Sequence, residues 1–120
     1  MTVHDIAACL QADTLLLSDE TVYGKDYVFA FATDLMSDAL AMIQESPENT
    51  VLLTGLANIQ SIRTAEMLDI DLIVLVRGKI PTEEMLEAAR ERGMNIIATK
   101  RTMYSACGCL YANGLREIND

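Results

Sequence analysis

Apolar positions along the chain follow two alternating patterns, one typical of strands and the other of amphipathic helices. Runs of five or six mostly apolar residues predict strands at 14–18, 27–32, 51–55, 71–76 and 95–99. Between these runs, apolar residues three and four positions apart predict helices at 3–10, 34–43, 58–68, 81–93 and 102–113. The charged segment SDETVYGKDY (18–27) shows neither pattern and is expected to be irregular.

The order of these elements predicts the fold class. After the first strand, strand and helix alternate four times, with short connections between them. Such units form right-handed crossovers and a mostly parallel sheet with helices on both faces. The run DLIVLV (71–76) is almost wholly apolar, as expected of a strand that is covered on both faces. We therefore predict one three-layer α/β/α domain over residues 1–120, with a mostly parallel five-stranded sheet.

The net charge of the chain disfavours two classes of binding partner. The 120 residues carry a formal net charge of −9 at pH 7, which argues against binding to nucleic acid or to an anionic membrane surface. Seven of the nine cations lie in the C-terminal half of the chain, from residue 77 onward: Arg77, Lys79, Arg90, Arg92, Lys100, Arg101 and Arg116. The sequence therefore still allows a local cationic site on an acidic protein.

The sequence predicts a cytoplasmic location. No apolar run approaches the ~20 residues of a membrane-spanning helix, and the N-terminal MTVHDIAACL lacks a signal-peptide pattern. In that compartment the odd number of cysteines, Cys9, Cys107 and Cys109, favours reduced thiols.

The corner FATDLMSDAL (31–40) brings two carboxylates, a threonine and a serine to the start of a helix. Thr33 or Asp34 is expected to cap this helix with a side-chain oxygen. Asp34 and Asp38 are four positions apart and share a helix face, but no histidine or cysteine is required to face them. We predict a capped helix here, with a catalytic carboxylate pair or a docking point for a ligand as the alternatives.

Polar residues follow each predicted parallel strand, where ligands bind in sheets of this class. These candidate ligand-binding residues are Thr33, Asp34, Thr54, Gly55, Asn58, Arg77, Gly78, Thr99 and Thr102, with Lys79 and Lys100 beside them. Cations, hydroxyls and free backbone N–H groups at one edge suit a small anion. The alternative interpretation is that these residues only form turns and helix caps. We expect no catalytic residue and no metal site.

The segment YSACGCLY (104–111) carries two of the cysteines. Two residues apart on a helix, Cys107 and Cys109 differ by about 200° and cannot bind one metal together. Cys107 is expected in the core, and Cys109 is expected to be exposed or at a subunit contact. A thiol or iron–sulfur role would require Cys9 to lie near them.

Four segments in this order resemble the DRTGG domain family: FATDLMSDALAMI (31–43), TVLLTGLANIQSIRTAEMLDI (50–70), LIVLVRGKIPTEEMLEAARERGMNIIAT (72–99) and TMYSACGCLYANGL (102–115). The resemblance implies the fold of the regulatory N-terminal domain of HPr kinase-like proteins, in a small stand-alone form. Such forms are often encoded beside iron-only hydrogenase and NADH-linked redox subunits. The Asp-Arg-Thr-Gly-Gly positions hold Asp26, Tyr27, Val28, Phe29 and Ala30 here. Both glycines are absent, and so is the GxxxxGK[ST] motif of a phosphate-binding loop.

These observations favour a non-catalytic regulatory or protein-interaction module. We expect a homodimer that requires no cofactor and senses a nucleotide or another small anion, and the resemblance implies a redox or hydrogenase complex as partner. One alternative is an enzyme for a phosphorylated small molecule, with Asp34 as base and Arg77 as the anion clamp. The other is a thiol or iron–sulfur accessory protein that uses Cys9, Cys107 and Cys109.

Overall fold

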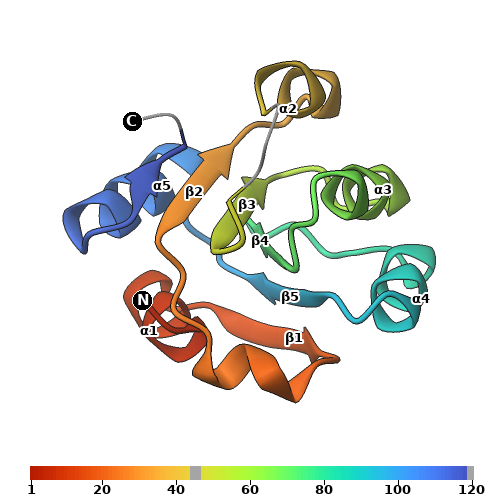
Figure 1. The fold of residues 1–120 in the computed structure, drawn as a ribbon, viewed down its shortest axis with the longest axis horizontal. Coiled ribbons are helices and arrows are strands. Elements are labelled where there is room, and N and C mark those ends of the chain that lie inside the picture. The colour runs from red at the N-terminus through yellow and green to blue at the C-terminus, as the bar shows by residue number, and fades with distance from the viewer. Residues whose placement is uncertain (44–46, 119–120) are drawn as a thin grey trace.

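The computed structural model describes residues 1–43 and 47–118, which form a sheet with helices on both faces (Figure 1). The helices are α1 (Val3–Leu10), α2 (Met36–Met42), α3 (Ile59–Met67), α4 (Glu83–Glu91) and α5 (Met103–Ala112), with the 3₁₀ helix η1 at Glu20–Gly24. The strands are β1 (Asp13–Leu17), β2 (Phe29–Ala32), β3 (Thr50–Thr54), β4 (Leu72–Leu75), β5 (Asn95–Ala98) and β6 (Arg116–Glu117). No helix in the described ranges is long and apolar enough to cross a membrane.

The strands are arranged in the order β1-β5-β4-β3-β2-β6. β1 is antiparallel to β5, and every other neighbouring pair is parallel. The predicted α/β class and mostly parallel sheet are confirmed, but the predicted number of five strands is wrong. The sixth strand, β6, pairs Arg116 with Phe29 and Glu117 with Ala30. Two residues are too few to produce a hydrophobic pattern, so no signal in the sequence indicated this strand.

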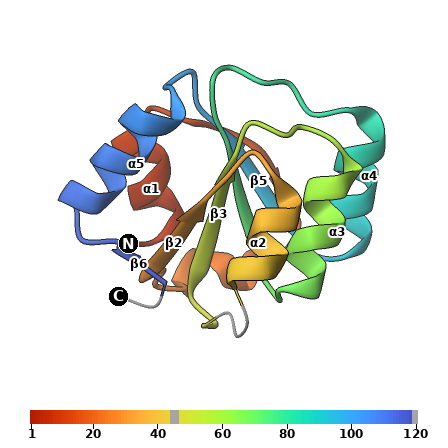
Figure 2. The ribbon, with the colours of Figure 1, turned by 90° about the horizontal axis from the view of Figure 1, so that it is seen from above.

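The layers account for the apolar runs of the sequence. Helices α2, α3 and α4 cover one face of the sheet, and α1 and α5 cover the other (Figures 1 and 2). Every residue of β3 and β4 is buried, because both faces of these central strands are covered. Each face packs its own aliphatic core, with Leu52 and Ile73 on the first and Val51 and Val74 on the second.

In the described residues, four α-helices begin at a side-chain N-cap, and α2 does not. Thr2, Asn58, Thr82 and Thr102 accept backbone N–H groups as N-caps of α1, α3, α4 and α5. The N-cap of α2 is Leu35, which makes no side-chain cap hydrogen bond. The predicted cap by Thr33 or Asp34 is therefore wrong, and the reason is that the Asp34 carboxylate is bound elsewhere.

The segment expected to be irregular contains η1 and fixes the N-terminal region to the sheet. Asp19 caps η1 by accepting the Thr21 N–H. Tyr27 is fully buried, and its hydroxyl donates to Asp71 at 2.8 Å. Lys25 also binds Asp71, at 2.9 Å. These polar contacts, together with the burial of Val22 and Tyr27 in the core, order a segment that has no periodic apolar pattern.

Candidate functional site

The carboxyl ends of the parallel strands lie along one edge of the sheet. The loops that follow β2, β3, β4 and β5 run side by side there, at the top of Figure 2. Backbone hydrogen bonds join neighbouring loops: Thr33 N–H donates to Leu53, Val76 N–H to Thr54 and Gly78 N–H to Thr99. We call this edge, residues 33–34, 54–58, 76–82 and 99–102, the rim.

Asp34, Gly55 and Arg77 meet at the centre of the rim. Asp34 accepts the Gly55 N–H at 2.6 Å and the Arg77 guanidinium at 2.8 Å. The guanidinium lies directly against Gly55, where a Cβ would overlap it. Gly55 is therefore required for the close approach of Arg77, and the three residues connect the ends of β2, β3 and β4.

The loop after β4 directs Arg77 toward Gly55. Arg77 and Gly78 both have left-handed backbone conformations, with φ of 61° and 67°. This conformation is uncommon for a residue with a side chain. Two hydrogen bonds to the neighbouring loop hold it, from Arg77 N–H to the Arg101 carbonyl at 2.8 Å and from Gly78 N–H to the Thr99 carbonyl at 3.0 Å.

The Asp34 carboxylate is stabilised in its ionised form. Partial burial acts to raise its pKa. The hydrogen bonds from the Gly55 N–H and the Arg77 guanidinium stabilise the charged form and lower the pKa, and the positive charges of Arg77 and Lys79 act in the same direction. The net result is a pKa below the usual value. Asp34 is thus an anion that holds Arg77 in place.

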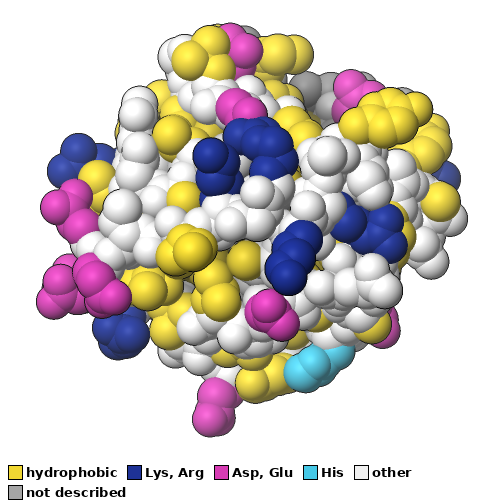
Figure 3. Space-filling model, turned by 180° about the vertical axis from the view of Figure 1, so that it is seen from behind, with side chains coloured by type: hydrophobic (Ala, Val, Ile, Leu, Met, Phe, Trp, Pro, Cys, Tyr) yellow, Lys and Arg dark blue, Asp and Glu magenta, His cyan; other side chains and the backbone are white. Residues whose placement is uncertain are grey.

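Beside this contact the rim opens into a hollow of about 730 Å³ between the loops after β4 and β5. The hollow is lined by Leu10, Gln11, Asp13, Leu15, Gly78, Lys79, Ile80, Pro81, Glu83, Leu86, Ala98, Thr99, Lys100 and Arg101. On the side of the molecule opposite to the view of Figure 1, Lys and Arg side chains gather across the middle of the face (Figure 3). The hollow therefore combines an apolar lining with three cations.

Thr99 and Arg101 form a wall of the hollow that is held by hydrogen bonds. The buried Thr99 hydroxyl donates to the Leu10 carbonyl at 2.7 Å and accepts the Arg101 N–H at 3.2 Å. Arg101 donates from its guanidinium to the Ser105 hydroxyl at 2.9 Å. Its Nε is buried without a hydrogen-bond partner in the described part of the chain.

The other sequence candidates serve the local structure. The Thr33 hydroxyl bonds within its own turn to Leu35, and the buried Thr54 hydroxyl accepts the Leu56 N–H. Asn58 and Thr102 cap helices α3 and α5. Of the nine candidates, the structure brings Asp34, Gly55 and Arg77 into contact and places Gly78 and Thr99 in the hollow.

Sequence reasoning missed the wall that α1 and β1 contribute. Leu10, Gln11, Asp13 and Leu15 line the hollow because β1 runs antiparallel beside β5, which brings the start of β1 to the rim. The sequence carries no local signal for that pairing. The sequence identifies Arg101 only as a cation, although its position next to Thr99 and Lys100 is a signal that it lies at the rim.

Two of the cysteines form a disulfide that the sequence did not predict. Cys9 of α1 is bonded to Cys109 of α5, 100 residues away, so the expectation of three reduced thiols is wrong for this pair. Cys107 is free and half-buried rather than in the core, and burial raises the pKa of its thiol. The described residues contain no group of three His, Cys, Asp or Glu that could hold a metal ion.

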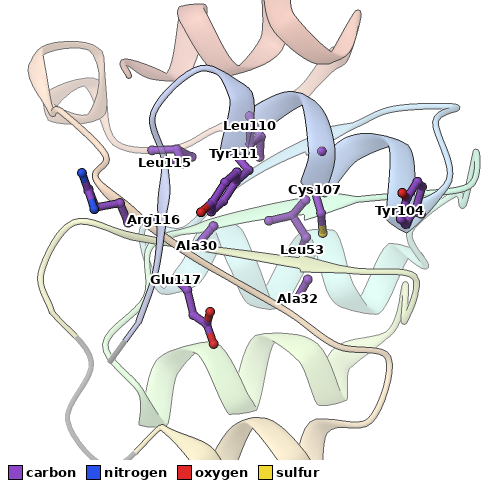
Figure 4. Close-up of a pocket in the computed structure, with 11 residues that line it drawn as sticks. Ala30, Ala32, Leu53, Tyr104, Cys107, Leu110, Tyr111, Leu115, Arg116 and Glu117 are labelled. Carbon is purple, nitrogen blue, oxygen red and sulfur yellow. The ribbon is translucent and has the colours of Figure 1, made fainter. Parts of the chain in front are cut away.

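A second, apolar groove lies between α5 and the β2–β6 edge of the sheet (Figure 4). It has a volume of about 390 Å³ and is lined by Ala30, Ala32, Leu53, Tyr104, Cys107, Gly108, Leu110, Tyr111, Leu115, Arg116 and Glu117. Tyr104 and Tyr111 are 92% and 70% exposed at its border. Because Ala30, Ala32 and Gly108 are small, α5 leaves this face of β2 only half-buried. We call it the α5 groove.

Comparison with known proteins shows the fold. No protein-family model matches the chain, and no curated protein matches it in sequence. A crystal structure of the CBS and DRTGG domains of the regulatory region of Clostridium perfringens pyrophosphatase, complexed with the activator diadenosine tetraphosphate, matches with a TM-score of 0.72 at 15% identity. The match covers 91% of this chain and 45% of that chain. This likeness supports the DRTGG-like fold that the sequence resemblance implies.

Proposed function

We propose that this chain is a non-catalytic, DRTGG-like regulatory module that binds a nucleotide or a related phosphorylated anion in the rim hollow. The observation that carries the proposal is the hollow itself, about 730 Å³ with Lys79, Lys100 and Arg101 on its wall. Pockets for small ligands usually have volumes of about 300–1,000 Å³. The Clostridium perfringens regulatory region, which shares the fold, is complexed with a nucleotide activator.

Charge favours an anion at this position. Three cations and two carboxylates, Asp13 and Glu83, line the hollow, while the chain as a whole carries a net charge of −9. A local excess of positive charge on an acidic protein directs anions to that place and away from the rest of the surface. The guanidinium of Arg101 adds hydrogen-bond donors at the same wall.

The apolar part of the lining favours a nucleotide over a bare phosphate. Leu15, Pro81 and Leu86 provide apolar surface in the hollow next to the lysines. A base and ribose cover such surface while the phosphates contact the cations. Inorganic phosphate or tripolyphosphate would use the cations alone and is expected to bind more weakly.

The same geometry disfavours the enzyme alternative. A general base works best with a pKa near the operating pH, whereas the pKa of Asp34 is lowered by its contacts with Gly55 and Arg77. Arg77 is in turn occupied by Asp34. Both residues proposed for catalysis are therefore used to hold the rim together.

Calorimetric titration of the full chain with AMP, ADP, ATP, diadenosine tetraphosphate and tripolyphosphate tests the proposal. We expect at least one nucleotide to bind and to raise the melting temperature, because a ligand at 100 times its Kd stabilises the native state by about 2.7 kcal/mol. Tripolyphosphate carries the charge without the base and ribose, so it distinguishes binding by charge alone from recognition of a nucleotide. The absence of binding by every compound would overturn the proposal.

A matched pair of double variants locates the site. Lys79→Ala with Lys100→Ala removes two exposed cations from the hollow and is expected to weaken nucleotide binding at least tenfold. Arg63→Ala with Arg90→Ala removes the same charge from exposed positions on α3 and α4 and is expected to change Kd less than twofold. Equal effects of the two pairs would show that only net charge matters.

A second copy of the chain is the partner that we propose for the α5 groove. The groove has exposed tyrosines at its border, and Arg116 and Glu117, which are consecutive residues of β6, both contribute to its lining. A two-fold interface brings the same surface of both copies together, so each contact occurs twice. Arg116 of one copy can then pair with Glu117 of the other, and Glu117 of the first with Arg116 of the second. An apolar surface with both charges at its end is therefore self-complementary.

Glycine variants test this contact by light scattering after gel filtration. Gly108 borders the groove, and a Cβ on it would meet nothing within 4 Å, so Gly108→Glu is expected to fold and to elute as a monomer. Gly24→Glu adds the same side chain in η1, where a Cβ also meets nothing within 4 Å, and is expected to remain a dimer. A monomeric wild-type chain would overturn the homodimer proposal.

The resemblance in sequence adds a cellular context to the proposal. It suggests a cytoplasmic redox or hydrogenase complex as the regulated partner. Affinity capture of the chain from its native host, compared with Gly108→Glu and the Lys79/Lys100 variant, tests this. We expect redox subunits to be enriched, and their absence from all captures would contradict it.

A further inference from the structure

The disulfide between Cys9 and Cys109 joins the first helix of the chain to the last. Cys9 lies in the final turn of α1 and Cys109 in the second half of α5, with their Cα atoms 6.6 Å apart. Both residues are half-buried, so the bond is within reach of a thiol from solvent. Asn113 donates to the Cys109 carbonyl at 2.8 Å and places the same amide nitrogen 3.4 Å from the Cys9 sulfur.

A short path leads from this bond to the rim hollow. Leu10 follows Cys9 directly, and its carbonyl accepts the buried Thr99 hydroxyl at 2.7 Å. Thr99 in turn accepts the Arg101 N–H. Leu10, Thr99 and Arg101 all line the hollow. The position of the end of α1 therefore determines one wall of the hollow, and the disulfide holds that end against α5.

We propose that the Cys9–Cys109 bond is a thiol–disulfide exchange site whose oxidation state controls ligand affinity in the hollow. The inference rests on the proposed function for the ligand itself. In the oxidised form the wall made by Leu10 and Thr99 is held covalently, and the hollow binds its ligand. In the reduced form α1 is held by packing alone, and the affinity falls.

The exchange requires a dithiol reductant, such as a protein with two neighbouring cysteines or dithiothreitol. One thiolate of the reductant attacks Cys9 or Cys109, forms a mixed disulfide and releases the other cysteine as a thiolate, which takes up a proton. The second thiol of the reductant then displaces the remaining cysteine and closes its own disulfide. Two electrons and two protons pass to the pair, and the reductant is oxidised.

Cys107 does not take part in this exchange. It lies two residues before Cys109 on α5 and, unlike Cys109, lines the α5 groove. Helical geometry separates the two side chains by about 200°. The pair therefore cycles between one disulfide and two thiols without reshuffling, and Cys107→Ser serves as the control variant.

Thermodynamic linkage makes the inference measurable in two directions. If reduction weakens the binding of a ligand by a given factor, that ligand disfavours reduction by the same factor. With ATP as the probe, we expect at least a threefold higher Kd for the reduced chain than for the oxidised chain. We expect saturating ATP to shift the dithiothreitol equilibrium of the bond toward the disulfide by the same factor, and Cys107→Ser to respond as the wild type does.

The experiment is titration of ATP into oxidised and reduced wild-type chain, with alkylation and mass spectrometry of Cys9 and Cys109 across a dithiothreitol series. Equal Kd values for the two forms would overturn the inference, and so would a pair that stays reduced in oxidised glutathione. If ATP binds neither form, hydrogen exchange at the Thr99 and Arg101 amides tests whether the disulfide holds the wall of the hollow. Faster exchange on reduction would support this coupling, and unchanged exchange would overturn it. The exchange measurement therefore distinguishes failure of the redox inference from failure of the nucleotide proposal.

Discussion

The guanidinium of Arg77 lies directly against Gly55, at a place where any side chain on residue 55 would overlap it. Asp34 binds both partners, through the Gly55 N–H at 2.6 Å and the guanidinium at 2.8 Å. The loops after β2, β3 and β4 are thus joined by one contact among Asp34, Gly55 and Arg77. This contact depends on the absence of a Cβ at residue 55.

A double-mutant cycle tests this contact. Gly55→Ala displaces the flexible end of Arg77 and weakens its bond to Asp34, whereas in an Arg77→Ala background the new methyl group meets no guanidinium. We expect a coupling free energy of about 0.5–3 kcal/mol from urea denaturation, because contacting residues are non-additive in this range. Additive effects of the two substitutions would contradict the contact.

Asp34 is expected to give stability a defined pH dependence. Its pKa is lower in the folded than in the unfolded chain, so its contribution is present above the unfolded value of about 4 and is lost as the pH falls through the folded value. Asp34→Asn should lower the free energy of unfolding by roughly 0.5–1 kcal/mol at pH 7, because the pair is partly exposed and screened. Urea midpoints at pH 7 and pH 3 measure this, and a difference that persists undiminished at pH 3 would contradict it.

Thr99→Val is expected to destabilise the chain by roughly 1–3 kcal/mol, because it leaves the Leu10 carbonyl and the Arg101 N–H without their shared partner. The substitution preserves shape and removes only the hydroxyl. Thr14→Val on the exposed face of β1 is the matched control and should stay within about 0.5 kcal/mol of the wild type. Equal stability of the two variants would show that the buried bond has no role.

Reduction of the disulfide is expected to lower the free energy of unfolding by about 2–4 kcal/mol, because the bond closes a long loop in the unfolded chain. Guanidinium denaturation with and without reductant measures the change. The Cys9→Ser/Cys109→Ser variant should be insensitive to reductant, and Cys107→Ser should respond like the wild type. A wild-type chain that is equally stable in both states would contradict the assignment of the bond.

The fold was predictable where local patterns determine it. The continuous apolar runs of β3 and β4 and the caps Asn58, Thr82 and Thr102 are readable along the chain, because each depends on residues within a few positions of it. From these elements the crossover rules predict a mostly parallel sheet. β6 escaped prediction because two residues produce no pattern.

The candidate site was predictable only in outline. Strand ends could be assigned to one edge, but Asp34 was expected to cap α2 because its long-range partners, Gly55 and Arg77, are not visible in the local sequence. The antiparallel placement of β1 and the pairing of Cys9 with Cys109 are also long-range events. The placement of β1 adds a wall of the hollow that strand-end reasoning alone did not include.

The most direct test of the central claim is a titration of the isotopically labelled, oxidised chain with ATP, followed by amide chemical shifts. We expect the largest shifts at Gly78, Lys79, Thr99, Lys100 and Arg101, with small shifts at Gly108 and Tyr111 in the α5 groove. Shifts centred on the groove, or none at saturating ATP and diadenosine tetraphosphate, would contradict the assignment of the rim hollow as the nucleotide site.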